Sequence, residues 1–164
     1  MLDPRCNAYA AAAAVVALDR FTKWIVETRV SLVDSYRVIP GFFDIVHTTN
    51  RGVAFGMLDN STSGWQSTLL VVLSLSAVVL LSALLWNPRR LDPRSLWGFS
   101  LILGGAAGNV FDRVVWGRVT DFLLVYIGRY QWPAFNVADS AIVIGCGLLL
   151  LDLLRPKRQA ANVP

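Results

Sequence analysis

Four apolar stretches, each about as long as a bilayer-spanning helix, constrain this chain more than any other feature. A helix needs about 20 apolar residues to cross the ~30 Å hydrocarbon core of a membrane. Hydrophobic residues make up 55 % of the sequence and charged residues only 16 %, whereas soluble domains carry about a quarter charged residues. We therefore expect an all-α membrane protein, a single integral-membrane domain over 1–164, with transmembrane helices at about 9–28, 65–86, 96–116 and 136–154.

The first stretch has a second interpretation, as a cleaved signal peptide, because the alanine run 10–14 resembles an apolar signal core. The preceding MLDPR is nearly neutral, however, and the apolar pattern continues past Asp19 and Lys23. We expect a retained helix.

Basic residues near the apolar stretches predict the orientation, because cytoplasmic loops are enriched in Lys and Arg. Arg5, three arginines in the short loop 87–95 and three basic residues after Leu154 indicate that both termini and this loop face the cytoplasm. The segments 27–64 and 117–135 then face outward. The net charge of +4 comes from such short clusters, so no nucleic-acid partner is expected.

The outward segment between the first two helices has strand character. Its apolar and polar residues alternate, and many of them are β-branched or aromatic. It also carries turn signals at Pro40-Gly41 and near Asn50. We expect a small extracytoplasmic β-sheet at about 33–60, lying on the outer membrane surface.

Metal and cofactor sites are not indicated. His47 is the single histidine, and Cys6 and Cys146 lie far apart without a metal-ligand motif or a disulfide partner nearby. We expect neither a metal nor a cofactor.

Ionisable residues inside the apolar stretches are the main functional signal, because such groups are rare in membranes and face the protein interior or water. Asp19 and Lys23 share one helix face at a spacing of four. They are either a self-neutralising pair or groups that order a site or contact a polar head group.

The third stretch combines small and polar residues. Gly104 and Gly108 form a GxxxG pattern that lets another helix approach closely. Asn109, Asp112 and Arg113 lie on one face near the outer end, either as an internal Asp–Arg pair or as part of a site, since each polar group there needs a buried partner.

Two further aspartates lie near that end. Asp121 follows the third helix, where it is either a solvated loop residue or a site residue. Asp139 opens the fourth, where it suits the third position of a capping box begun by Asn136. Because about 19 residues join the two helices, their outer ends should be neighbours.

Two close carboxylates share a proton, because they do not both ionise easily. One then takes a proton from water while the other protonates the carbonyl or leaving group of an amide. Ser61 and Ser140 have no histidine or lysine at an obvious distance, and the D-T/S-G signature of soluble aspartic proteases is absent. A different kind of aspartyl peptidase is therefore indicated.

Five motifs in order make the chain resemble the lipoprotein signal peptidases, or signal peptidase II, over nearly its whole length. The motifs are DRFTK (19–23), NRGVAFG (50–56), GGAAGNVFDRV (104–114), VTDF (119–122) and FNVADSA (135–141). Departures from the family pattern are minor variants in VFDRV and NRGVAFG, and none removes a presumed catalytic group.

The resemblance implies a multi-pass aspartic endopeptidase of the bacterial inner membrane, with its active site near the outer face. Such enzymes remove the signal peptide from diacylglyceryl-modified prolipoproteins, just before the lipidated cysteine, and the cyclic peptide globomycin is a known ligand. It also implies that Asp121 and Asp139 are catalytic. Residues implied to support the site or bind substrate are Asp19, Lys23, Asn50, Gly52, Gly105, Gly108, Asn109, Asp112, Arg113, Asn136 and Ala138.

Two other classes remain open on the residues alone. A small proton-coupled transporter would use the same acids as relay groups. A transport path needs polar groups through the whole depth, however, and the second helix is almost free of them. A structural membrane scaffold would tolerate the loss of either aspartate.

Overall fold

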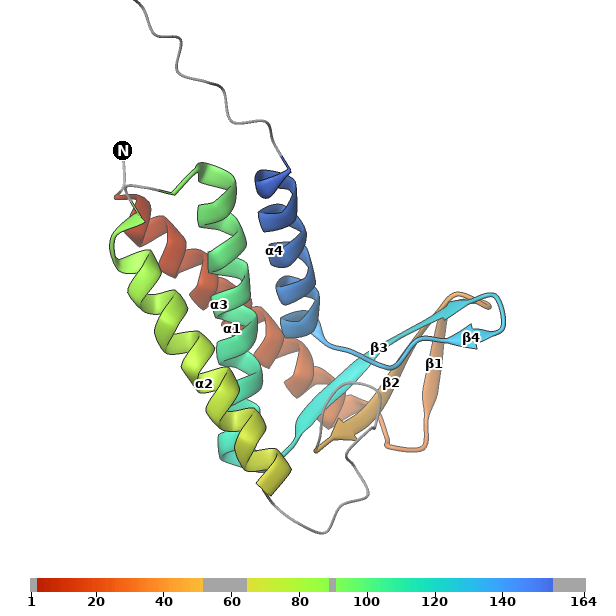
Figure 1. Ribbon diagram of the computed structural model, residues 1–164. Helices are drawn as coiled ribbons and strands as arrows, with labels where there is room; N and C mark the ends of the chain where they lie inside the picture. Colours follow the sequence, from red (N-terminus) through yellow and green to blue (C-terminus); the bar gives the residue numbers. More distant parts are fainter. Residues whose placement is uncertain (1–2, 52–64, 89–90, 155–164) are drawn as a thin grey trace, which may run out of the picture.

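A group of helices and an antiparallel sheet make up the computed structural model, which describes residues 3–51, 65–88 and 91–154 (Figure 1). Within these residues four helices lie side by side, and a four-stranded sheet of order β1-β2-β3-β4 extends from one end of them. The elements are α1 (Pro4–Arg29), β1 (Ser35–Ile39), β2 (Phe43–Asn50), α2 (Trp65–Trp86), α3 (Pro93–Trp116), β3 (Val119–Ile127), β4 (Tyr130–Gln131) and α4 (Val137–Leu153).

The four predicted helices are present, with small changes at their ends. Helix α2 has the predicted bounds, whereas α1 begins at Pro4 rather than near residue 9. Asp3 caps α1 by accepting a hydrogen bond from the Arg5 backbone N–H at 2.9 Å, and Pro4 suits the first helical position. Helix α3 likewise begins early, with Pro93 after Asp92.

The sheet differs from the prediction, which drew it only from the segment between the first two helices. Strands β3 and β4 come from the segment between α3 and α4, and residues 52–60 of the predicted β region lie outside the described residues. The run VTDFLLVYI is rich in β-branched and aromatic residues and satisfies its backbone by pairing with β2. Asp121 therefore lies on a buried strand, and its interpretation as a solvated loop residue is wrong.

Polar side chains lie inside the helical group and large apolar side chains lie outside. Helix α3 packs against α1, α2 and α4, and the interior contains buried charged and amide groups, among them Asp19, Lys23 and Asp112. The outward surface exposes residues such as Leu80 and Val143. This is the reverse of a soluble protein, and it suits lipid, where polar groups must be satisfied internally.

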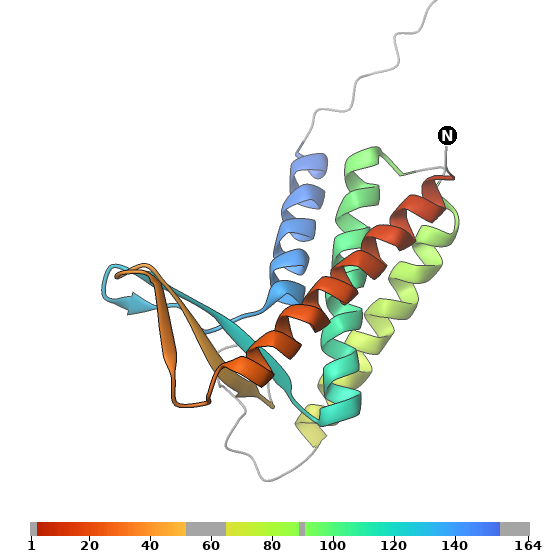
Figure 2. The ribbon, with the colours of Figure 1, turned by 180° about the vertical axis from the view of Figure 1, so that it is seen from behind.

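Among the described residues one helix is long and apolar enough to cross a membrane by length and composition, at Thr68–Trp86, and only 6 % of that window is buried. Helix α1 carries Asp19, Lys23 and other charged residues, and α4 has 17 residues. The N-terminal end of α1 and the C-terminal end of α4 lie opposite the sheet (Figure 2).

Glycines of α3 allow the neighbouring backbones to approach, as the GxxxG spacing predicts. A Cβ atom on Gly104 would lie 2.6 Å from the Ala12 carbonyl oxygen of α1, and one on Gly105 would collide with the Ala138 carbonyl of α4. On Gly108 it would lie 2.9 Å from the Asp19 carboxylate. These contacts bring α1 and α4 onto adjacent faces of α3, where the two helices also touch each other.

We expect Gly105→Ala to destabilise the protein by about 1–3 kcal/mol, because the added methyl group meets backbone atoms that cannot move independently. The matched control is Gly147→Ala, since that helical glycine has nothing within 4 Å of the new Cβ position and should be neutral or slightly stabilising. Thermal unfolding in detergent measures both. Equal midpoints for the two variants would contradict this packing.

Candidate active site

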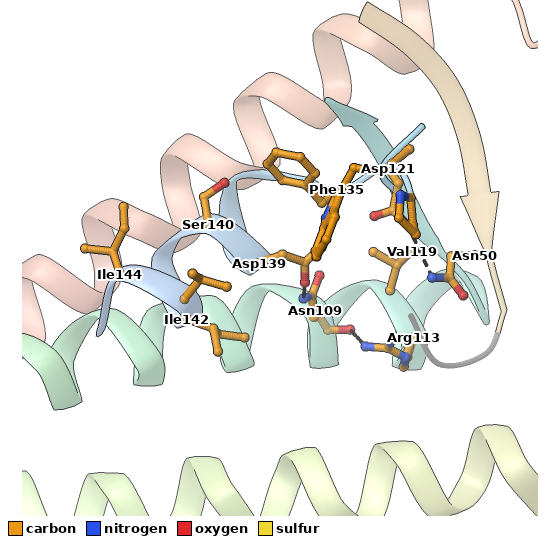
Figure 3. Close-up of a pocket in the computed structure, with 14 residues that line it drawn as sticks. Asn50, Asn109, Arg113, Val119, Asp121, Phe135, Asp139, Ser140, Ile142 and Ile144 are labelled. Atoms are coloured by element: carbon orange, nitrogen blue, oxygen red, sulfur yellow. Dashed lines mark hydrogen bonds between the residues drawn. The ribbon is translucent and has the colours of Figure 1, made fainter. Parts of the chain in front are cut away.

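Two aspartates from separate elements line one cavity of about 620 Å³ (Figure 3). Asp121 lies on β3 and Asp139 is the third residue of α4. Asn136 connects them: its side-chain Nδ2 donates to Asp121 Oδ1 at 2.7 Å, and its backbone N–H donates to Asp139 Oδ2 at 3.3 Å. One buried asparagine therefore holds both carboxylates beside the same space.

Asp139 has both a local and a tertiary role. The predicted capping box is present, because the Asp139 backbone N–H donates to Asn136 Oδ1 at 2.9 Å while the Asp139 carboxylate accepts from the Asn136 backbone. Its other oxygen accepts a hydrogen bond from Asn109 Nδ2 at 2.7 Å. The N-terminal turn of a helix also favours negative charge there.

Asp121 is more deeply enclosed, with 4 % of its surface exposed. Burial, followed by the nearby charge of Asp139, raises the pKa of the Asp121 carboxyl to about 6. Hydrogen bonds from Asn136 Nδ2 and from Asn50 Nδ2, the latter at 3.3 Å, oppose this rise by favouring the ionised form. The two aspartates thus occupy different electrostatic environments.

A buried ionic cluster lies next to the site. Lys23 Nζ contacts Asp19 Oδ2 at 2.7 Å and Asp112 Oδ2 at 2.6 Å, and all three side chains are buried. The predicted Asp19–Lys23 pair is therefore present, but it does not neutralise itself alone, because Lys23 also binds Asp112 of α3. Asp112, for which the sequence allowed a pair with Arg113, binds Lys23 and Arg20 of α1.

The cluster connects directly to the aspartate of α4. Lys23 Nζ donates to Asn109 Oδ1 at 3.2 Å, and because a lysine ammonium only donates, the Asn109 Nδ2 is left to face Asp139. Asp19 Oδ1 accepts the Ala138 backbone N–H at 2.9 Å, in the first turn of α4. Helix α1 therefore orients both a hydrogen-bond donor to Asp139 and the helix that carries it.

The remaining predicted residues divide into three groups. Asn50 and Arg113 line the cavity, and Arg113 Nη1 donates to the Asn109 carbonyl at 3.4 Å. Gly105 and Ala138 lie where α3 meets α4, and Gly108 lies where α3 meets both Asp19 of α1 and Ala138 of α4. Gly52 lies outside the described residues.

Ser140 also lines the cavity, but its hydroxyl donates to the Asn136 carbonyl at 2.9 Å. This bond to the carbonyl one helical turn earlier occupies the hydroxyl proton, and among the described residues no histidine or lysine is its partner. Ser61 lies outside the described residues.

Sequence reasoning missed two residues of α1 that join it to α3 and β3. Arg20 binds Asp112 at 2.6 Å and lies over the Trp116 ring at 4.2 Å. Glu27 accepts a hydrogen bond from Thr120 Oγ1 at 2.7 Å, next to Asp121 in the strand. The spacing of Arg20 and Glu27 around Lys23 on one face of α1 was the available signal.

The fold and the buried polar site belong to the class of bacterial membrane enzymes. One solved structure, described as a bacterial membrane enzyme studied by the in meso method, has a TM-score of 0.83 and 31 % identity, and the similarity covers 96 % of this chain and 94 % of that one. A second structure of the same description has a TM-score of 0.80 over 92 % of this chain and 94 % of that one, also with 31 % identity.

Sequence comparison gives the family. Residues 11–155 match the family described as signal peptidase (SPase) II. A lipoprotein signal peptidase of Solibacter usitatus is 67 % identical over 99 % of both chains, and one of Oleidesulfovibrio alaskensis is 43 % identical over 91 % of this chain and 95 % of that one. The chain belongs to the signal peptidase II family of aspartic peptidases.

We expect Lys23→Met to destabilise the protein by about 3–5 kcal/mol, because it leaves the Asp19 and Asp112 carboxylates short of a buried cation. The double variant Asp19→Asn with Lys23→Met should recover much of this loss. It removes one charge of each sign, and the amide oxygen introduced by Asp19→Asn can still accept from the Ala138 N–H. Thermal unfolding in detergent measures the stability of both variants. A double variant less stable than Lys23→Met would contradict the claim that unpaired buried carboxylates cause the loss.

Proposed function

We propose that Asp121 and Asp139 are the catalytic pair with which this lipoprotein signal peptidase removes the signal peptide from prolipoproteins. The observation that carries the proposal is their placement: both line one cavity, and Asn136 donates a hydrogen bond to each. Neither a serine nor a metal is needed for this chemistry.

Amide hydrolysis by such a pair uses one ionised and one protonated carboxyl group. The ionised group removes a proton from a water molecule as the water oxygen attacks the carbonyl carbon, and the protonated group donates to the carbonyl oxygen. When the tetrahedral intermediate collapses, the C–N bond breaks and the leaving nitrogen takes a proton from the carboxyl group that deprotonated the water. The other carboxylate takes back the proton that it gave to the carbonyl oxygen, so the pair again holds one proton. The water has then been divided between the new acid and the new amine.

The environments of the two groups suggest which one starts with the proton. Burial and the charge of Asp139 raise the pKa of Asp121 to about 6, which favours its protonated form. Asp139 accepts hydrogen bonds from Asn109 and from the Asn136 backbone within the first turn of α4, a position that favours negative charge. We assign Asp121 as the initial proton donor and Asp139 as the base that activates water.

The surrounding residues then take supporting roles. Asn109 and Asn136 orient the carboxylates, and Asn50 and Arg113 supply hydrogen bonds around the scissile bond. Asp19, Lys23 and Asp112 hold Asn109 and α4 in place. Gly105, Gly108 and Ala138 allow close packing, and Gly52 is assigned to the site by the family motif alone.

The apolar part of the cavity suits a lipid-modified substrate. Ile142, Val143 and Ile144 of α4 line it, and Val143 is 70 % exposed on the outer surface of the helices. A diacylglyceryl-modified prolipoprotein entering sideways from the bilayer would meet this apolar wall and then the carboxylates, with cleavage before its lipidated cysteine. The cyclic peptide globomycin should compete for the same space.

This arrangement supports one integral domain with four transmembrane helices in the bacterial inner membrane. Both termini would face the cytoplasm, as the basic residues near the helix ends predict. The first turn of α1 and the last turn of α4 lie at the opposite end of the helices from the sheet, which would then face outward (Figure 2). The transporter alternative is disfavoured, because the ionic cluster lies near the sheet end and the described part of α2 is almost entirely apolar.

We expect Asp121→Asn and Asp139→Asn each to lower kcat by at least about a thousandfold, because each removes a proton-transferring group that acts in the transition state. Both variants should insert into membranes and unfold cooperatively in detergent. Release of the signal peptide from a lipidated prolipoprotein by purified protein is the measurement. Near-normal cleavage by either variant would exclude the proposed pair, and only the peptidase hypothesis predicts inhibition by globomycin.

The pH dependence should report the proton on Asp121. The active pair keeps one proton, so kcat/KM falls as the pH rises through the pKa of Asp121, near 6 in the free enzyme. Asn50→Ala removes a hydrogen bond that lowers this pKa, so the alkaline limb should move to higher pH, by up to about one unit. An alkaline limb that stays in place or moves to lower pH in Asn50→Ala would contradict the assignment of the proton to Asp121.

A further inference from the structure

Strand β2 contains a bulge directly opposite the site strand. Ile45 pairs with Leu123, whereas Thr48 pairs with Asp121, so two residues of β2 lie opposite a single residue of β3. Such an extra residue bends the strand and changes which way the following side chains point.

This bulge decides the face on which Asn50 lies. Directly paired residues share a face of the sheet, so after the bulge Thr48 and Asn50 lie on the same face as Asp121. Had the pairing of Ile45 with Leu123 continued without the extra residue, His47 would oppose Asp121. Asn50 would then point to the other face, away from the carboxylate to which it now donates.

His47 lies in the bulge and ties it to α1. Its Nδ1 lies 2.8 Å from the carbonyl oxygen of Val30, the residue that follows α1. A carbonyl only accepts, so Nδ1 carries the proton. Val30 is itself fixed, since its N–H donates to the Val26 carbonyl at 2.9 Å, and the end of α1 lies beside β2 in Figure 2.

We propose that His47 is a positioning residue, which holds the β2 bulge against the end of α1 and thereby sets Asn50 on the face where it reaches Asp121. His47 does not touch the carboxylates and acts only through Asn50. The inference rests on the proposed function, because it presumes that Asp121 is catalytic. It gives the single histidine of the chain a role unrelated to metal binding or proton transfer.

The first test compares side chains that keep or lose the donor. His47→Leu removes it at similar size and should lower kcat/KM on a lipidated prolipoprotein about tenfold, which corresponds to about 1.4 kcal/mol. His47→Asn places an amide N–H where Nδ1 lies and should recover most of the activity. His47→Gln extends its amide beyond that point and should behave like His47→Leu.

The matched control is Thr49→Ala. Thr49 is an exposed residue of the same strand that pairs with Thr120, so it lies on the face opposite Asp121, and its loss should leave kcat/KM unchanged. A loss equal to that of His47→Leu would show general sensitivity of the strand and overturn the proposal.

The second test separates positioning from general stability. In an Asn50→Ala background, His47→Leu should cause little further loss, because the contact that it disturbs is already absent. In the otherwise unchanged protein it should also shift the alkaline limb in the same direction as Asn50→Ala. A full tenfold loss in the Asn50→Ala background, or equal activity of the Asn and Gln variants, would overturn the proposal. Should His47→Leu not fold, the Asn and Gln variants decide the question in both backgrounds.

Failure of this inference is distinguishable from failure of the proposed catalytic pair. If Asp121→Asn is inactive while His47→Leu retains full kcat/KM, the role of His47 is wrong and the pair stands. If Asp121→Asn cleaves normally, the pair itself is wrong, and with it the inference.

Discussion

Pairing of buried charge is the constraint on which the rest of the structure depends. Lys23 is enclosed among helices and holds two carboxylates, Asp19 and Asp112, from two of them. A buried charge without partners is very costly. Helices α1 and α3 must therefore pack so that Lys23 and Asp112 lie at the same level and face each other. Because Asp19 also accepts the Ala138 N–H, the same cluster sets the start of α4. The ionic cluster thus anchors the first turn of the helix that carries Asp139 against α1.

Hydrophobic length and local capping made much of this fold predictable from sequence. The four helices follow from apolar runs, and the capping box follows from the spacing of Asn136 and Asp139. The motifs also named most residues that meet at the cavity. Contacts between residues within about one helical turn can be predicted from the sequence, as the capping box shows.

Long-range pairing could not be predicted in the same way. Strand β3 looked like a connecting segment, because its partner β2 lies about 70 residues earlier and no local pattern indicates the match. The bulge at His47 was likewise hidden, since the residue count between paired positions appears only once the two strands are aligned. Arg20 and Glu27 were missed for a related reason: their partners, Asp112 and Thr120, lie on other elements.

The two aspartates differ because they are held by different kinds of element. Asp139 lies in a helix N-terminal turn, which supplies backbone donors and a favourable dipole for an ionised carboxylate. Asp121 lies on a buried strand, which supplies no such dipole, and burial there favours the protonated form. Placing one acid on each element gives two chemically identical groups different surroundings. Asn136, which lies between the strand and the helix, contacts both groups and keeps that asymmetry within one site.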